Sequence, residues 1–206
     1  MLEIQCFCDS IMGENCYLVR DLDGAAVVID PGFGADKAVS SYFSEIQAIL
    51  LTHGHFDHIA SVKEIASQTH AKVYLHHADA AFPQTPALCL SGMLPGASCP
   101  PFSPDVLLSD EDEIRVGGLV FRVLHTPGHT GGSVCYLTGD AVFTGDTVLS
   151  GSIGRTDFPT GDRVAMRASC GKIAALPVYL RVYPGHGEES TIAWEKKNNW
   201  YLRDAL

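Results

Sequence analysis

Hydrophobic residues along this chain occur in short runs separated by turn-forming residues, a pattern typical of β-strands. Between two early runs stands Asp23-Gly24, a dipeptide that favours a tight hairpin turn. Later runs are joined in the same way at Gly117-Gly118 and at Gly139-Asp140. The expected strands cover residues 2–7, 16–20, 25–30, 48–51, 72–75, 114–116, 119–124, 134–137, 141–143 and 178–182.

A helical spacing of apolar residues interrupts these strands at four places. After residue 58, for example, Ile59, Val62 and Ile65 recur at the three-residue spacing of one helix face. The expected helices cover residues 35–43, 59–68, 163–176 and 192–200. Strands that alternate with helices predict an α/β fold. A single domain over 1–206 is expected, although a length of 206 residues would by itself permit two.

The segment 81–104 fits neither pattern, because it carries six prolines among apolar residues such as Phe82, Cys89 and Met93. Proline interrupts both helices and sheets, so regular structure is not expected there. Loops of this length in a compact domain are usually functional lids or disordered, and this one is too apolar for simple disorder. Three roles stay open: a cover over a functional cleft, a contact in a homodimer, or a plain surface excursion.

Four potential metal ligands stand within six residues in the motif H-x-H-x-D-H, formed by His53, His55, Asp57 and His58. Neutral imidazole and carboxylate suit zinc, iron or manganese. An apolar strand precedes the motif and a helix follows it, so the motif is expected on a strand-to-helix loop. A solvated loop rich in histidine is the alternative explanation, and the partners found downstream argue against it.

Those partners are His129, Asp146 and His186, each of which follows an apolar strand in a turn that contains glycine. Glycine beside a ligand lets the backbone approach a metal ion closely. One tetrahedral site needs three or four ligands, and the chain offers seven. Seven ligands suit two divalent ions about 3.5–4 Å apart that share a carboxylate and a bridging hydroxide. We expect two ions per chain, with zinc as first choice and iron or manganese as alternatives.

These motifs, taken in order over nearly the whole chain, resemble the metallo-β-lactamase superfamily, and within it the short glyoxalase II-like hydrolases. The resemblance implies a four-layered αββα sandwich, in which helix, two sheets and helix stack in that order. It also implies that His53, His55 and His129 hold one metal ion, that Asp57, His58 and His186 hold the second, and that Asp146 bridges them. The matching motifs are Asn15 to Val19, Asp30-Pro31-Gly32, Thr52 to His58, His125 to Gly131, Phe143 to Thr147, Gly154 to Asp157 and Tyr183 to Gly187.

Three other branches of that superfamily fit the residues less well. β-Lactamases carry a cysteine or another residue where a bridging aspartate would sit, so Asp146 argues against them. Flavin-linked di-iron relatives have glutamate at the position of His55, and they need a flavin domain that this chain is too short to carry. Nucleases need a surface that accepts polyanions, whereas a formal charge of −10 repels nucleic acid.

The resemblance implies hydrolysis of a thioester such as S-lactoylglutathione, or of another small ester or lactone. Metal ions lower the pKa of bound water from 15.7 to about 7 and polarise a carbonyl, so no nucleophilic side chain is needed. Asp57 and Asp146 are the predicted catalytic residues. Asp57 would bind a metal ion and orient the hydroxide, and Asp146 would bridge the two ions. Arg155 is a candidate contact for a substrate carboxylate, with a salt bridge to Asp157 or Asp162 as the alternative. Full-length glyoxalase II enzymes carry a further helical domain that holds glutathione, and this domain is not expected here.

A second reaction class stays open beside hydrolysis. Persulfide dioxygenases resemble this chain in the same motifs, including the Gly-Arg-Thr-Asp run, but they use one iron. In that family only His53, His129 and Asp146 would bind the metal, which leaves positions open for oxygen and a persulfide. A metal-binding protein without turnover is the third alternative.

The cysteine content and the hydropathy of the chain predict a cytoplasmic protein. Seven cysteines without regular spacing indicate reduced thiols. Cys6 and Cys8 alternate along an expected strand and point the same way, for which burial in the core or chance is the expectation and a metal or redox pair the alternative. The first residues show no signal peptide, and no run approaches the ~20 apolar residues of a membrane span. The expected partner is a small-molecule substrate, without nucleic acid or membrane, and the chain is either a monomer or a homodimer. His70, His76 and His77 are expected to be exposed or to cap helices.

Overall fold

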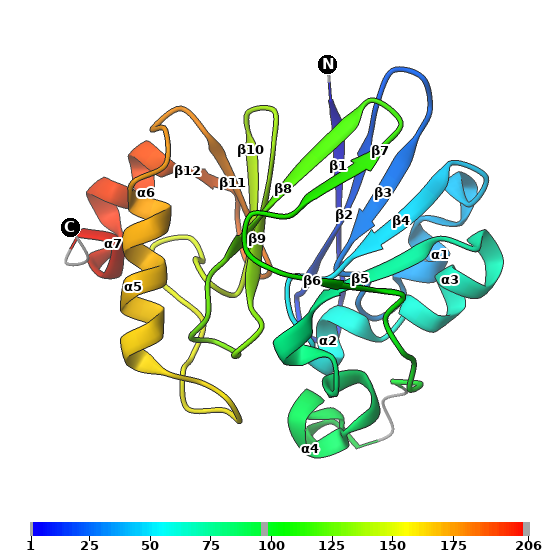
Figure 1. The fold of residues 1–206 in the computed structure, drawn as a ribbon, viewed down its shortest axis with the longest axis horizontal. Helices are drawn as coiled ribbons and strands as arrows, with labels where there is room; N and C mark the ends of the chain where they lie inside the picture. The colour runs from blue at the N-terminus through cyan, green and yellow to red at the C-terminus, as the bar shows by residue number, and fades with distance from the viewer. Residues whose placement is uncertain (1, 96–98, 204–206) are drawn as a thin grey trace.

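The computed structural model of the chain describes residues 2–95 and 99–203, and two six-stranded sheets lie at its centre (Figure 1). The first sheet contains, in spatial order, β1 (Glu3–Cys8), β2 (Asn15–Arg20), β3 (Ala26–Ile29), β4 (Ile46–Leu50), β5 (Lys72–His76) and β6 (Val106–Leu108). The second contains β12 (Ser190–Thr191), β11 (Arg181–Pro184), β10 (Ala141–Gly145), β9 (Val134–Thr138), β8 (Leu119–His125) and β7 (Glu113–Val116).

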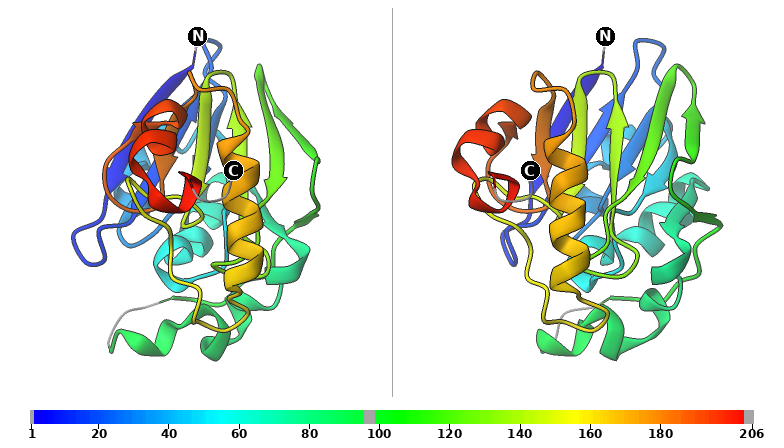
Figure 2. Two further views of the ribbon diagram at one scale, coloured as in Figure 1. Left: turned by 90° about the vertical axis from the view of Figure 1, so that its left-hand side faces the viewer. Right: turned by 60° about the vertical axis from the view of Figure 1, so that its left-hand side comes forward.

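Helices lie outside the pair of sheets, as the two turned views in Figure 2 also show. The helices within the first half of the chain are α1 (Ala35–Ala38), η1 (Ser40–Tyr42), α2 (Phe56–Ile59), α3 (Val62–Thr69), η2 (His77–Asp79), η3 (Phe82–Gln84), α4 (Pro86–Cys89) and η4 (Ser91–Met93). Those within the second half are α5 (Arg163–Ala174), α6 (Ile192–Asn198) and α7 (Trp200–Arg203). The predicted α/β fold with four αββα layers is therefore confirmed. No helix in the described part of the chain is long and apolar enough to cross a membrane.

The layers follow from the alternation of side chains along the strands, since successive residues point to opposite faces of a sheet. Tyr17 and Val19 of β2 pack in the apolar cluster between the two sheets. Leu18, between them, packs in the outer cluster together with Ile65 of α3. A buried apolar side chain of this size contributes roughly 1.5–3 kcal/mol, so both faces of each sheet stabilise the sandwich.

The carboxyl ends of several strands meet at one edge of the sandwich, at the lower end in Figure 1. Strands β3 to β6 run parallel to one another. In the second sheet β10 is parallel to β11, and β8 shares their direction because β9 is antiparallel to both β8 and β10. The loops after β4, β8, β10 and β11 therefore leave the two sheets on the same side.

Several predicted elements differ from the structure, among them the helix expected over 192–200, which is divided into α6 and α7. Two of the differences have a clear local cause. The helix expected over 35–43 is divided into α1 and η1, because Val39 lies outside the helical region of backbone angles and the Ser40 hydroxyl donates to the Lys37 carbonyl. The strand expected over 178–182 begins only at Arg181, because the preceding residues form a turn in which the Leu180 amide donates to the Pro177 carbonyl.

The segment 81–104 contains regular structure, so the prediction of none is wrong. Pro83 and Pro86 lie in the first turns of η3 and α4, where the missing N–H of proline costs no hydrogen bond. Phe82 and Cys89 are buried in the outer cluster of the first sheet and anchor the segment. Residues 96–98 of this segment lie outside the described residues.

Burial differs from expectation at three side chains. Cys6 and Cys8 are exposed, because β1 is the edge strand of its sheet and nothing covers these two thiols. His76 is buried, because its ring stacks on His125 with 4.0 Å between centroids. The capping alternative holds for His76, since its Nδ1 accepts a hydrogen bond from the Ala78 amide at the start of η2.

Candidate metal centre

The four residues of the H-x-H-x-D-H motif lie directly after β4. His53 and His55 lie on the connecting loop, whereas Asp57 and His58 belong to α2, which begins at Phe56. All four of these side chains are buried. The predicted strand-to-helix loop is therefore present, and the helix expected over 59–68 is divided into α2 and α3.

The other three candidates follow the strands of the second sheet. His129 lies in the loop after β8, Asp146 directly follows β10, and His186 is two residues beyond β11. Asn15 of β2 holds the turn at His186, because its side-chain amide donates to the carbonyls of Pro184 and Gly187. Because the four strands end at one edge, the structure brings all seven predicted residues together.

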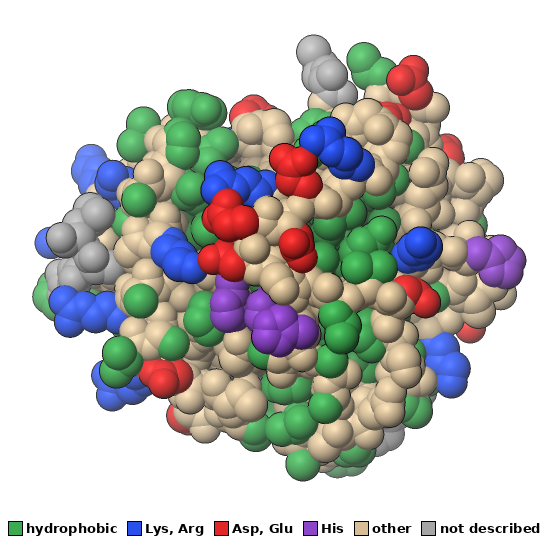
Figure 3. Space-filling view, viewed as in Figure 1, with side chains coloured by type: hydrophobic (Ala, Val, Ile, Leu, Met, Phe, Trp, Pro, Cys, Tyr) green, Lys and Arg blue, Asp and Glu red, His purple; other side chains and the backbone are tan. Residues whose placement is uncertain are grey.

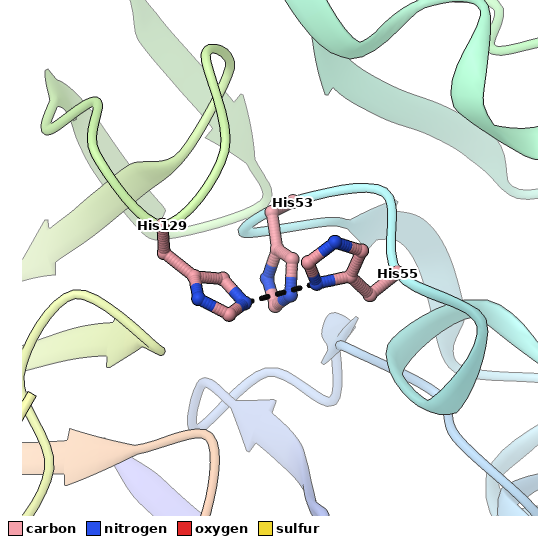
Figure 4. Close-up of side chains that lie close together, drawn as sticks. All are labelled: His53, His55 and His129. Atoms are coloured by element: carbon pink, nitrogen blue, oxygen red, sulfur yellow. Dashed lines mark hydrogen bonds between the residues drawn. The ribbon is translucent and has the colours of Figure 1, made fainter. Parts of the chain in front are cut away.

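His53, His55 and His129 form one group of candidate ligands, shown in Figure 4. Their nearest nitrogens lie within 4.8 Å of one another, and His55 Nδ1 is 2.9 Å from His129 Nε2. The His129 Nδ1–H donates to the carbonyl of Arg155 at 2.7 Å, which leaves the lone pair on Nε2 facing the group. Three imidazoles that point to one space suit a single metal ion.

Asp57, His58 and His186 form a second group. Asp57 Oδ2 lies 3.4 Å from His186 Nε2 and 4.0 Å from His58 Nε2. The other nitrogen of His58, Nδ1, lies 3.1 Å from Asp30 Oδ2, so its proton is engaged there and the lone pair of Nε2 faces the group.

Asp146 lies between the two groups and turns one oxygen to each. Its Oδ2 is 3.5 Å from His129 Nε2 in the first group. Its Oδ1 is 3.6 Å from His58 Nε2 and 3.8 Å from His186 Nε2 in the second. A Cβ at Gly185 would collide with Asp146 Oδ1, which explains the glycine beside His186. This is the geometry of a bridging carboxylate.

Several atoms in this space are buried without a hydrogen-bond partner among the described residues, namely His53 Nε2, His58 Nε2 and Asp146 Oδ1. An unsatisfied buried polar atom costs about 1–3 kcal/mol, so a cluster of them needs a compensating ligand. Divalent cations provide that compensation, and nitrogen and oxygen donors of this kind suit zinc, iron and manganese. The residues therefore fit a divalent metal site.

Asp30 orients two of the histidines and was not recognised as a site residue from the sequence. It accepts hydrogen bonds from the Thr52 amide at 2.7 Å and from the Thr52 hydroxyl at 2.6 Å. Since that hydroxyl proton is engaged, Thr52 Oγ1 accepts from His53 Nδ1 at 3.1 Å, and His53 Nε2 keeps its lone pair. The sequence signal was the Asp30-Pro31-Gly32 turn after a buried strand, which was noted without a role.

Asp79 and Glu14 are two further buried acids that sequence reasoning missed. Asp79 accepts hydrogen bonds from the amides of Gly54 and Gly132 and from the hydroxyl of Thr130. It thereby ties the loop that carries His53 to the loop that carries His129. Glu14 lies 3.8 Å from His58, and burial raises its pKa well above the ordinary value. Neither acid stands in a motif that would distinguish it from a surface residue.

The first group of histidines is prepared to bind metal at neutral pH. Burial, together with the neighbouring His129, lowers the pKa of His55 to about 3. Burial and the nearby His58 likewise hold the pKa of His53 well below its usual range. Both rings are therefore neutral near pH 7, the form in which imidazole binds a metal ion.

The second group holds protons more strongly. Burial acts to lower the pKa of His58, but the carboxylates of Asp57, Asp30 and Asp146 raise it well above the ordinary value. The pKa of His186 is also raised, because its hydrogen bond to Asp57 outweighs burial. A metal ion must displace these protons in order to bind.

The metal affinity of the second group should therefore depend more steeply on pH than that of the first. As pH falls from 8 to 6, each proton that the ion displaces weakens its binding by up to about tenfold per pH unit. Metal content measured after dialysis across this range should fall from two ions per chain to one before it falls further. Parallel loss of both ions would contradict the different protonation of the two groups.

Arg155, the candidate substrate contact, lies at the rim of the site. Its guanidinium forms two hydrogen bonds of 2.7 Å to the carboxylate of Asp157, so the salt bridge weighed as an alternative is present. The same guanidinium stacks over the ring of Phe158 at 3.9 Å. A contact between Arg155 and a substrate stays a prediction.

Comparison with known proteins agrees with this geometry. Residues 11–186 match the family model described as the metallo-beta-lactamase superfamily. A probable metallo-hydrolase of Bacillus subtilis, YqgX, is 35% identical over 195 residues, 91% of this chain and 92% of that protein. The hydroxyacylglutathione hydrolase GloC of Haemophilus influenzae is 32% identical over 198 residues, 92% of each.

Among solved structures, BLEG-1, described as a B3 metallo-beta-lactamase, has a TM-score of 0.91 and 36% identity, covering 97% of this chain and 99% of its own. ETHE1 from Myxococcus xanthus has a TM-score of 0.78 and 34% identity over 96% and 83% of the two chains. TTHA1623, solved in a di-iron-bound form, has a TM-score of 0.84 and 34% identity over 96% and 100%. The family match, the relatives and the shared fold lead to one conclusion: this chain belongs to the metallo-β-lactamase superfamily and has the fold of a metallo-hydrolase.

Proposed function

We propose that this protein is a metal-dependent hydrolase that cleaves a thioester at a dinuclear site. The observation that carries the proposal is Asp146, whose two carboxylate oxygens face two separate groups of three ligands. In this proposal His53, His55 and His129 hold one ion, and Asp57, His58 and His186 hold the other. Zinc is our first choice for the metal, with iron and manganese as alternatives.

The chain's own residues orient the reaction around that site. Two divalent ions, when bound, supply hydroxide at neutral pH and a Lewis acid for a carbonyl oxygen. Asp57 lies at the open side of the second group, where its carboxylate can accept a hydrogen bond from the attacking water and orient it. Asp146 keeps the two groups at a fixed separation, and Asp30 keeps His53 and His58 in the tautomers that leave Nε2 free.

A small thioester is favoured over a macromolecule as the substrate. Similarity to the hydroxyacylglutathione hydrolase GloC supports thioester chemistry, with S-lactoylglutathione as the first compound to test. On the face drawn in Figure 3, Lys and Arg side chains are scattered among acidic and uncharged ones, and the formal charge is −10. That distribution disfavours nucleic acid as a partner. Seven free cysteines support the cytoplasm as the compartment.

Hydrolysis of a panel by the zinc-loaded, manganese-loaded and iron-loaded protein tests this proposal. The panel contains S-lactoylglutathione, a neutral acetyl thioester, an oxygen ester, a lactone and a β-lactam. We expect the thioesters to have the highest kcat/KM. The β-lactam is included because of the similarity to BLEG-1. If it were hydrolysed faster than every thioester, the proposal would be wrong, and so would the argument from Asp146 against a β-lactamase.

Persulfide oxidation is the second candidate, because the motifs of this chain, including Gly154 to Asp157, also resemble those of persulfide dioxygenases. The similarity to ETHE1 from Myxococcus xanthus, at 34% identity, keeps an alternative to hydrolysis open. That reaction would use one iron at His53, His129 and Asp146. Metal analysis of protein purified without added metal or chelator separates the two candidates. Two ions per chain favour the hydrolase, whereas one iron, together with oxygen uptake on addition of a persulfide, favours the dioxygenase.

A further inference from the structure

A cavity of about 320 Å³ opens directly over the candidate metal ligands. Its floor contains His55, Asp57, His129 and Asp146, so both ligand groups reach it. Asp146, the candidate bridge, is only partly buried and lines this cavity, which places an open side of the site here. A substrate bound in this cavity would present its reacting carbonyl to the space between the two groups.

The walls of the cavity are apolar. One wall comes from Met12 and from the segment after α4, with Leu90, Met93 and Leu94. The segment 149–158 also contributes Leu149, Ile153 and Phe158 to the lining. Hydrophobic side chains also gather at the lower end of the face in Figure 3, where α4 lies in Figure 1.

Two of these wall residues are exposed to solvent. Met93 is 60% exposed and Met12 is 41% exposed, which is unfavourable for large apolar side chains unless something covers them. Exposed apolar side chains that gather around a cleft mark a ligand-binding surface, and methionine adapts to ligands of varied shape. An apolar ligand group would remove these surfaces from water.

Positive charge at the cavity is scarce. Among the described residues that line it, Arg155 is the one Lys or Arg, and its guanidinium is already paired with the carboxylate of Asp157 at 2.7 Å. Glutathione carries two carboxylates, and each would need a cation to offset the loss of hydration. The lining therefore favours a substrate without negative charge near the reacting bond.

We propose that the acyl group of the substrate is an uncharged aliphatic chain, which lies between the 90–94 segment and the 149–158 segment. The inference rests on the proposed thioester hydrolysis and specifies its substrate class. At about 30 Å³ for a water-sized group, the cavity holds roughly ten non-hydrogen atoms, enough for the thioester and six to eight acyl carbons. Water breaks the carbon–sulfur bond, its OH adds to the acyl carbon and its proton goes to the thiol, so the products are a carboxylic acid and a free thiol.

The kinetic test uses acetyl, butyryl, hexanoyl and octanoyl thioesters of one small neutral thiol, N-acetylcysteamine. Each methylene of the acyl chain that is fully buried should raise kcat/KM about fourfold. Because the cavity is open and buries the chain only in part, we expect a rise of at least about tenfold from the acetyl to the hexanoyl thioester. The hexanoyl thioester should also have a higher kcat/KM than S-lactoylglutathione. A flat series, or a preference for the glutathione thioester, would overturn the inference while leaving thioester hydrolysis in place.

Met93→Ser tests the wall directly, because this exposed side chain can be changed without disturbing the core. We expect the ratio of kcat/KM for hexanoyl over acetyl to fall by about three- to tenfold. Leu22→Ser is the matched control, because Leu22 is 82% exposed and lies in the turn between β2 and β3, outside the cavity lining. An unchanged ratio in Met93→Ser would contradict the placement of the acyl chain.

Binding without turnover separates this inference from the proposed function. S-hexyl and S-ethyl thioethers of N-acetylcysteamine cannot be hydrolysed, and calorimetric titration measures their affinities. We expect the hexyl compound to bind at least about tenfold more tightly, and Met93→Ser to reduce that difference. Selective hexyl binding without hydrolysis of any thioester would overturn the reaction and leave the apolar site standing, whereas equal binding of the two compounds would overturn the site itself.

Discussion

Replacing Asp146 by alanine should reduce metal content from two ions per chain to less than one and lower kcat/KM for the best thioester by at least about a thousandfold. The side chain faces both ligand groups, so its removal takes one oxygen from each. A loss of about 4 kcal/mol in stabilisation of the transition state corresponds to this factor. Elemental analysis together with steady-state kinetics measures both effects on one preparation.

Asp140→Ala is the matched control, because Asp140 is exposed and precedes β10, at the opposite end of that strand from Asp146. The control should keep its metal and its activity. Asp146→Asn adds a second comparison, since the amide keeps the shape of the side chain but loses its charge. Full metal content and full activity in both Asp146 variants would refute the bridging role.

Replacing Asp79 by alanine should lower the free energy of unfolding by about 3–5 kcal/mol. The change removes the acceptor of three buried donors, the Gly54 amide, the Gly132 amide and the Thr130 hydroxyl. In a chain of this length such a loss lowers Tm by roughly 6–20 °C. Thermal unfolding of the metal-free protein measures the effect, so that metal affinity does not contribute.

Two further variants test whether the change in Tm comes from the loss of the buried acceptor at Asp79. Asp79→Asn keeps an acceptor and should recover part of the lost Tm. Asp23→Ala, in the exposed turn before β3, should leave Tm unchanged. If Asp79→Ala unfolded at the temperature of the wild type, the buried carboxylate would have no role in joining the two loops.

The fold and the seven candidate ligands were accessible from the sequence for physical reasons. Period-two alternation and glycine-containing turns located strands such as β8 and β9, because one face of each strand packs in the core. Four potential ligands within six residues stand out in the sequence itself, because no structural role requires histidine and aspartate at the spacing of His53, His55, Asp57 and His58. His129, Asp146 and His186 were recognised because each follows an apolar strand.

The residues that support the ligands were not accessible in the same way. Asp30 and Asp79 are single acids whose partners lie 22 to 53 positions away in the chain, and only the folded structure brings them together. His76 was expected to be exposed or to cap a helix, because nothing local indicates its stacking on His125. The short helices within 81–104 are not predicted by the sequence, because proline interrupts a helix everywhere except in its first turn. The single domain over 1–206 and the oligomeric state stay predictions.

The order of the strands has a consequence for how the protein acquires its metal during synthesis. Every strand of the first sheet precedes residue 109, and every strand of the second begins at residue 113 or later. For the ligand set proposed here, neither half of the chain completes a site, since the first group takes His129 and the second group takes His186 from the later half. A nascent chain that has emerged only to β6 therefore holds four ligands but no finished site. If the proposed sites bind zinc, iron or manganese, selection among these metals would take place once the two halves have docked. Ions bound to ligands of both halves would then stabilise the docked state by mass action.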